Sequence, residues 1–149
     1  MMERAFSPRD HAWQDRVRNS FAQQGAMRLL GASMAELSPG RCTIVLPFRE
    51  ELAQQHGYFH AGITSAIADS AGGYAALTLF PHSAEVLTVE FKINLIAPAL
   101  DGLLRAEANV VRSGRTLTIC SVEVSVDRDG ARMPCALMQQ TLIRIDHKR

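Results

Sequence analysis

The segment from Gly62 to Phe80 constrains the fold of this chain more than any other part of the sequence. Its apolar residues recur at helical spacing, and most of the remaining positions are Ala, Gly, Ser or Thr. A helix that is apolar or small on every side is normally buried all round. The segment therefore predicts a central helix enclosed by other elements, with small residues that let neighbouring backbones pack close to it.

Strand patterns are found on both sides of this helix. They cover residues 32–37, 41–47, 87–95, 103–111, 116–126 and 135–145. Within residues 87–95, apolar and polar residues alternate, which is typical of a half-buried strand whose apolar face starts at Leu87 and Val89. Two strands, a helix and four strands in this order predict an α+β fold, in which an antiparallel sheet wraps around the central helix.

A further helix is predicted near the N-terminus. Ser7 is expected to cap it, and Pro8 to occupy its first position. An apolar stripe with a spacing of four follows, and Gly25 is the expected end. The stripe consists of Trp13, Val17 and Phe21. We expect this helix to lie on a surface and to dock by the stripe.

Length, charge and cysteine content exclude several classes of protein. The 149 residues suit one domain, with residues 1–26 as an N-terminal extension and 27–149 as the core. A formal charge of +1 lacks the broad positive field of non-specific nucleic-acid binders. No stretch offers the roughly 20 apolar residues of a membrane span, and the first residues lack the apolar core of a secretory signal. The three cysteines lie in apolar surroundings without a C-x-x-C pair, so we expect buried free thiols and a cytoplasmic protein.

Asp69 is the one carboxylate in the predicted central helix. A carboxylate inside a buried helix is costly unless another group stabilises it. One interpretation is structural, with Asp69 bonded to a neighbouring backbone group or to the hydroxyl of Ser65 or Ser70. The other is that Asp69 belongs to a functional site. The residue pattern alone leaves both open.

The approach to the helix, residues 54–62, provides a second candidate feature. Gly57 and Gly62 allow a sharp entry, so the first unpaired N–H groups of the helix point outward, as an anion or oxyanion site requires. His56 and His60 are four residues apart, but a third metal ligand is not evident, and we expect no metal.

Several catalytic motifs are absent from the sequence. Ser70 lies in Ala68-Asp69-Ser70-Ala71-Gly72, which lacks the first glycine of G-x-S-x-G. The chain also lacks a P-loop, a G-x-G-x-x-G fingerprint and an H-E-x-x-H pair. Serine-hydrolase chemistry and dinucleotide binding are therefore disfavoured, and no cofactor is expected.

The stretch His60-Ala61-Gly62-Ile63-Thr64-Ser65-Ala66-Ile67-Ala68-Asp69 resembles a known signature, H-G-G-x(6)-D. This signature is typical of hotdog-fold acyl-CoA thioesterases of the phenylacetate-degradation (PaaI-like) type. The resemblance continues through residues 87–94, Ala97-Pro98 and residues 112–117, and covers most of the chain from about Met27. It implies a hotdog fold and the hydrolysis of acyl-CoA to free acid and CoA. The predicted N-terminal helix lies outside the hotdog pattern and is an addition to it.

The resemblance also implies roles for individual residues. Asp69 corresponds to the helix carboxylate that acts as nucleophile or as general base for water. The backbone N–H of Ala61, with His60 beside it, corresponds to the group that polarises the thioester carbonyl. Gln54 matches an upstream polar residue that is often Asn in relatives, and Thr88 matches the hydroxyl that helps to position water. Ala61 stands where the signature has its first glycine.

The CoA part of the substrate is expected to bind two further segments. The resemblance assigns this role to Ala97 and Pro98 and to a basic turn. The turn consists of Arg112, Ser113, Gly114, Arg115 and Thr116.

Helix geometry predicts that two chains build each active site. Ala61 and Asp69 are eight residues apart, which is about 12 Å along one helix. A single reacting carbonyl cannot lie about 3 Å from both. We therefore expect a homodimer, or a homotetramer built as a dimer of dimers.

Two other functions are compatible with the same pattern. One is a non-catalytic acyl-CoA sensor or binding module, although about 25 residues before Met27 are too few for the DNA-binding domain that such regulators usually carry. The other is a hotdog dehydratase acting on hydroxyacyl thioesters, although the predicted helix carries no added catalytic His/Glu pair. The identity of the acyl group is left open by the sequence.

Overall fold

The computed structural model describes residues 5–147. Its helices are α1 (Trp13–Gln23), α2 (Gly25–Leu30) and α3 (Ala61–Leu77), with a short 3-10 turn at Glu50–Leu52. Its strands are β1 (Ser33–Ser38), β2 (Arg41–Pro47), β3 (Ala84–Leu95), β4 (Leu103–Ser113), β5 (Leu117–Arg128) and β6 (Ala131–Asp146). These strands form one antiparallel sheet in the order β1-β2-β4-β5-β6-β3. Among the described residues, no helix combines the length and apolar character needed to cross a membrane.

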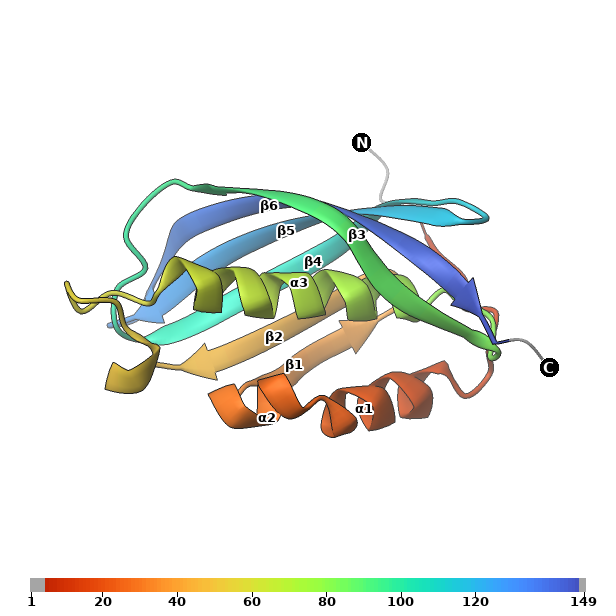
Figure 1. Ribbon diagram of the computed structural model, residues 1–149, viewed down its shortest axis with the longest axis horizontal. Coiled ribbons are helices and arrows are strands. Elements are labelled where there is room, and N and C mark those ends of the chain that lie inside the picture. The colour runs from red at the N-terminus through yellow and green to blue at the C-terminus, as the bar shows by residue number, and fades with distance from the viewer. Residues whose placement is uncertain (1–4, 148–149) are drawn as a thin grey trace.

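The sheet curves around α3, while α1 and α2 lie together beside β1 and the C-terminal half of α3 (Figure 1). Fully buried small residues on α3, such as Ala68 and Ala71, let the strands approach the helix closely. Ile67 on α3 and Leu142 on β6 are also fully buried, and each contributes about 2 kcal/mol of hydrophobic stabilisation. The predicted α+β arrangement with an enclosed central helix is confirmed.

A β-bulge changes which face of β3 points toward α3. In the pairing with β6, Thr88 lies opposite Leu142 and Phe91 lies opposite Gln140, so Val89 is the extra residue. Paired residues of an antiparallel ladder share a face, and Leu142 and Gln140 are both buried. Thr88 and Phe91 therefore face the helix. The strict alternation predicted for this strand is wrong at this point, and both Leu87 and Val89 are more than half exposed.

The N-terminal helix starts later than the sequence predicted. The expected cap at Ser7 is wrong, because α1 begins at Trp13 and the turn before it is fixed by Asp10. The Ala12 N–H donates to Asp10 Oδ1 at 3.0 Å, and this bond is the main reason why the pKa of Asp10 is lowered. Of the predicted stripe, Val17 is fully buried.

The expected stop at Gly25 is a break between two helices. Gly25 begins α2, which ends where Gly31 adopts a left-handed conformation with φ 83°. Buried Met27 therefore belongs to a helix, and the first strand starts at Ser33. The boundary placed between residues 26 and 27 falls inside α2, and the division into extension and core stays a prediction.

Arg16 of α1 caps the C-terminal end of α3. Its guanidinium donates to the carbonyl oxygens of Leu77 and Phe80, both at 2.9 Å, and of Pro81 at 2.6 Å. The last carbonyl groups of a helix lack intrahelical partners and carry partial negative charge, so a cation is favourable there. An ion pair with Asp10 at 3.3 Å holds the Arg16 side chain in place. Arg16 thereby ties the N-terminal helix to the central one.

Replacing Arg16 should lower the stability of the whole domain. In Arg16→Ala, several carbonyl groups lose a charged donor, and we expect the free energy of unfolding in urea to fall by about 2 to 3 kcal/mol. Arg18→Ala is the matched control, because Arg18 is exposed on the same helix and its loss should change stability by less than about 0.5 kcal/mol. Equal effects of the two substitutions would show that the cap contributes nothing specific.

Candidate active site

The N-terminus of α3 presents one backbone donor that has no partner among the described residues. His60 is the N-cap, and its Nδ1 accepts the Gly62 N–H at 2.9 Å. The N–H groups of Ile63 and Thr64 both donate to the His60 carbonyl. Within residues 5–147, the Ala61 N–H makes no hydrogen bond. The ring of His60 therefore shapes the helix entry, while the Ala61 N–H is available at the positive end of the helix dipole.

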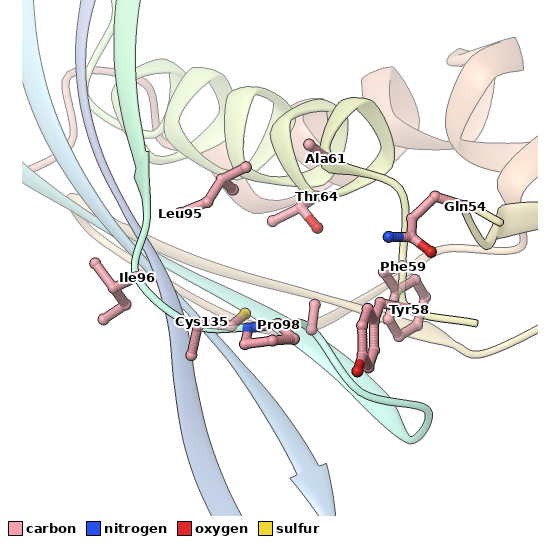
Figure 2. Close-up of a pocket in the computed structure, with 11 residues that line it drawn as sticks. Gln54, Tyr58, Phe59, Ala61, Thr64, Leu95, Ile96, Pro98 and Cys135 are labelled. Carbon is pink, nitrogen blue, oxygen red and sulfur yellow. The ribbon is translucent and has the colours of Figure 1, made fainter. Parts of the chain in front are cut away.

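Ala61 lines a cavity of about 440 Å³ (Figure 2). Gln54, Tyr58, Ala61, Thr64 and Pro98 are among the residues that line it. The side-chain oxygen of Gln54 accepts the backbone N–H of His56, and the amide NH2 group has no acceptor in the described part of the chain. Figure 2 shows the nitrogen of Gln54 directed toward the space between Gln54 and Thr64. Gln54 and Ala61 thus bring two N–H donors to one cavity, and Ala97 lines it as well.

Asp69 lies where α3, β3 and β6 meet. Thr88 Oγ1 donates to Asp69 Oδ1 at 2.6 Å, and Gln140 Nε2 donates to the same oxygen at 2.5 Å. The hydroxyls that a structural role would have used are engaged elsewhere, since Ser65 donates to the Ala61 carbonyl and Ser70 to Gln24 Oε1. Among the described residues, Asp69 Oδ2 accepts no hydrogen bond. One carboxylate oxygen is therefore fixed and the other is available.

A second cavity, of about 370 Å³, opens at this carboxylate. Asp69 and Thr88 line one part of it, and Tyr74 lines another. Ser20 and Gln24 of α1 form a further wall, and both contact the Tyr74 hydroxyl, at 3.3 and 3.4 Å. The N-terminal helix therefore shapes the space next to Asp69.

A single chain does not bring the predicted site residues together. α3 is continuous from Ala61 to Asp69, so the two residues lie about 12 Å apart along the helix axis. They line different cavities. Ala97 and Pro98 lie with Ala61 at the N-terminal end of α3. The turn of residues 112–116 lies at the other end, where Ser113 borders a surface hollow together with Leu79.

Gln140 is a site residue that the sequence analysis missed. It is fully buried on β6 and also donates to the Asp69 carbonyl oxygen at 3.1 Å. The sequence contains a pattern from which Gln140 could have been found. It occupies the position between Met138 and Leu142 on the apolar face of the last predicted strand. A buried amide requires hydrogen-bond partners, and the carboxylate of Asp69 on the central helix is an acceptor for it.

The three cysteines are free and buried, as predicted. Burial raises the pKa of the thiols of Cys42 and Cys120 to about 12, and that of Cys135 to about 11. These thiols are therefore protonated near neutral pH. Although Cys135 lines the first cavity, it does not supply the thiolate that a cysteine nucleophile requires. In residues 5–147, no three His, Cys, Asp or Glu side chains gather as a metal site would need.

A family model described as the Thioesterase superfamily matches residues 56–131. The match runs from the helix entry through α3 and β3 to the end of β5. The chain belongs to the Thioesterase superfamily. A protein of Saccharolobus solfataricus that is named as an esterase is 33% identical to this thioesterase over 103 residues, which cover 69% of this chain and 72% of the relative.

Solved structures agree with this family. A thioesterase family protein from Silicibacter pomeroyi superposes with a TM-score of 0.89 at 44% identity, covering 91% of this chain and 99% of that one. The PaaI protein of Escherichia coli, from the phenylacetic acid degradation operon, superposes with a TM-score of 0.81 at 18% identity, covering 91% and 94%. The predicted hotdog fold and thioesterase family are confirmed, and the protein is an enzyme that hydrolyses thioesters.

Proposed function

We propose that this thioesterase hydrolyses acyl-CoA to the free acid and CoA, and that Asp69 activates the attack on the thioester carbonyl. The observation that carries the proposal is the environment of Asp69. Its Oδ1 accepts hydrogen bonds from Thr88 and Gln140, while its Oδ2 accepts none from residues 5–147 and lies beside a cavity. A carboxylate fixed in this way is oriented for general-base or nucleophilic chemistry without further rearrangement.

Each step of the proposed reaction has a group to support it. As a general base, Asp69 takes a proton from a water molecule that it holds together with Thr88. The resulting hydroxide adds to the carbonyl carbon, and the oxyanion that forms accepts hydrogen bonds from the Ala61 N–H and the Gln54 NH2, each worth about 3 kcal/mol when well placed. The C–S bond then breaks, the proton passes to the CoA thiolate, and the acid is released. If Asp69 is instead the nucleophile, water hydrolyses the resulting anhydride in a second step.

The proposed site requires a second copy of this chain. Two antiparallel copies of α3, related by a two-fold axis, place the Ala61 N–H of one chain opposite Asp69 of the other. The free edge of the sheet supports this arrangement, because β3 exposes large apolar side chains there. These are Leu87 at 56%, Val89 at 55%, Phe91 at 43% and Leu95 at 53% exposure. A long apolar edge strand is a site where another chain can pair with the sheet. In a homodimer, the second chain would cover the apolar side chains of β3. A dimer of dimers stays a prediction, as does the cytoplasmic location.

The same arrangement accounts for the separated CoA-binding segments. Ala97 and Pro98 lie at the N-terminal end of α3, and residues 112–116 at its C-terminal end. Antiparallel helices bring these segments from different chains to the same end of the dimer. Arg112 and Arg115 are exposed and make no ion pair among the described residues, so their guanidinium groups are free to bind the CoA phosphates.

No observation favours the sensor or the dehydratase over this function. Family membership makes the protein a thioester hydrolase, which argues against a sensor. On α3, Asp69 remains the one carboxylate and is not joined by a second acid–base residue.

The proposed role of Asp69 predicts a large loss of activity in Asp69→Asn. Without the charge, kcat should fall by about 100-fold or more. The assay follows the release of free thiol from acetyl-, hexanoyl-, palmitoyl-, benzoyl- and phenylacetyl-CoA with a thiol reagent. Asp15→Asn makes the same chemical change at an exposed position of α1 and should leave kcat unchanged. Activity of Asp69→Asn within a few-fold of the wild type would refute the catalytic assignment.

Arg112→Ala and Arg115→Ala should weaken CoA binding without slowing the chemical step. Because phosphate contacts act equally in the ground and transition states, we expect KM to rise by about threefold to tenfold while kcat stays near the wild-type value. Acyl-pantetheine, which lacks the nucleotide, should be insensitive to both changes. Arg128→Ala is the control, since Arg128 is an exposed arginine paired with Asp101 in another loop. A loss of kcat on acyl-pantetheine would contradict the assignment.

A further inference from the structure

Gln140 is fully buried, and its amide is directed at the candidate carboxylate. Gln140 Nε2 donates to Asp69 Oδ1 at 2.5 Å and lies 3.1 Å from the Asp69 carbonyl oxygen and 3.3 Å from Thr88 Oγ1. The opposite orientation of the amide would place its oxygen against the carboxylate. The NH2 group of Gln140 therefore faces Asp69, and both its hydrogens have acceptors within reach.

The other end of the same amide is left without a partner. Gln140 Oε1 is buried, and no donor among the described residues reaches it. It occupies the space beside Gly72, where a Cβ atom would lie only 1.7 Å from this oxygen. A buried carbonyl without a hydrogen bond costs about 1 to 3 kcal/mol. If position 140 had only a structural role, an apolar residue of the same size would make the fold more stable. The amide therefore indicates a functional role.

We propose that Gln140 is the positioning residue that determines which oxygen of Asp69 reacts. Thr88 approaches Asp69 Oδ1 from β3, and Gln140 approaches the same oxygen from β6. Two donors on one oxygen fix the plane of the carboxylate and leave Oδ2 as the reacting atom. Gln140 also binds the backbone carbonyl of Asp69, so it holds the helix turn as well as the side chain.

This inference rests on the proposed function of Asp69, and it gives Gly72 a role as well. Gly72 leaves the space that Gln140 Oε1 fills, so the two residues act as one unit. The neighbouring Gly73 is different, because a Cβ there would meet only Leu142 Cδ2, at 4.0 Å. Gln140 lies outside residues 56–131, the part of the chain that the family model matches.

The test separates positioning from a merely structural role by measuring kcat, KM and thermal stability together. Gln140→Met keeps the volume, removes the donor and also removes the unpartnered oxygen. We expect kcat on the acyl-CoA panel to fall by about tenfold or more, with KM within about twofold of the wild type and a melting temperature that is equal or higher. Gln139→Met is the matched control, because Gln139 is exposed on the opposite face of β6 and its kinetics should match the wild type.

Two outcomes overturn the inference. One is a kcat of Gln140→Met within about twofold of the wild type, and the other is a loss of kcat that accompanies a drop in melting temperature. Asp69→Asn, assayed alongside, separates this failure from failure of the proposed function. If Asp69→Asn is inactive while Gln140→Met is active, only the positioning role is wrong, whereas an active Asp69→Asn refutes both.

Gly72→Ala provides a second variant that does not alter Gln140 itself. The new methyl group displaces the amide of Gln140, so kcat should fall as it does in Gln140→Met. Gly73→Ala adds a methyl group without a close contact, and it should leave the melting temperature unchanged or raise it. In a Gln140→Ala background, Gly72→Ala should reduce kcat no further, because its effect acts through Gln140. Additive losses in the double variant would contradict the coupling.

Discussion

The hydrogen bonds that Thr88 and Gln140 donate to Asp69 connect the central helix α3 to the strands β3 and β6. Asp69 is half-buried on α3, and its Oδ1 receives donors from two adjacent strands. The bulge at Val89 turns Thr88 toward α3, and Gly72 makes room for Gln140. Local features of three elements are therefore explained by the requirements of a single side chain.

The sequence predicted the elements well where the pattern was local and periodic. The expected helix from Gly62 to Phe80 corresponds to α3 at Ala61–Leu77, because a segment that is small and apolar on all sides has few alternatives. The placement of Asp69 beside Thr88 followed from the family resemblance and not from the pattern. Strict alternation would have turned Thr88 away from the helix if Leu87 and Val89 faced it, and a bulge is not visible in the alternation itself.

Contacts between distant segments account for what the sequence did not reveal. Arg16 caps a helix more than 60 residues away, and Gln140 reaches Asp69 across 71 positions. Ser7 and Asp10 both precede α1 and are both residue types that favour turns and helix starts. Asp10 fixes the turn, because it accepts the Ala12 N–H and also contacts Arg16 and His82. Such choices depend on tertiary structure.

The central claim is that each active site combines Asp69 of one chain with the Ala61 N–H of another, and complementation between two inactive variants tests it most directly. Asp69→Ala removes the carboxylate. Ala61→Pro removes the backbone N–H at the first position of α3, where proline is well tolerated. Co-refolded in equal amounts, the two variants should recover about a quarter of the wild-type activity, since half of the dimers are mixed and each mixed dimer holds one intact site. A mixture that stays inactive, although both variants fold and form mixed dimers, would contradict the shared site.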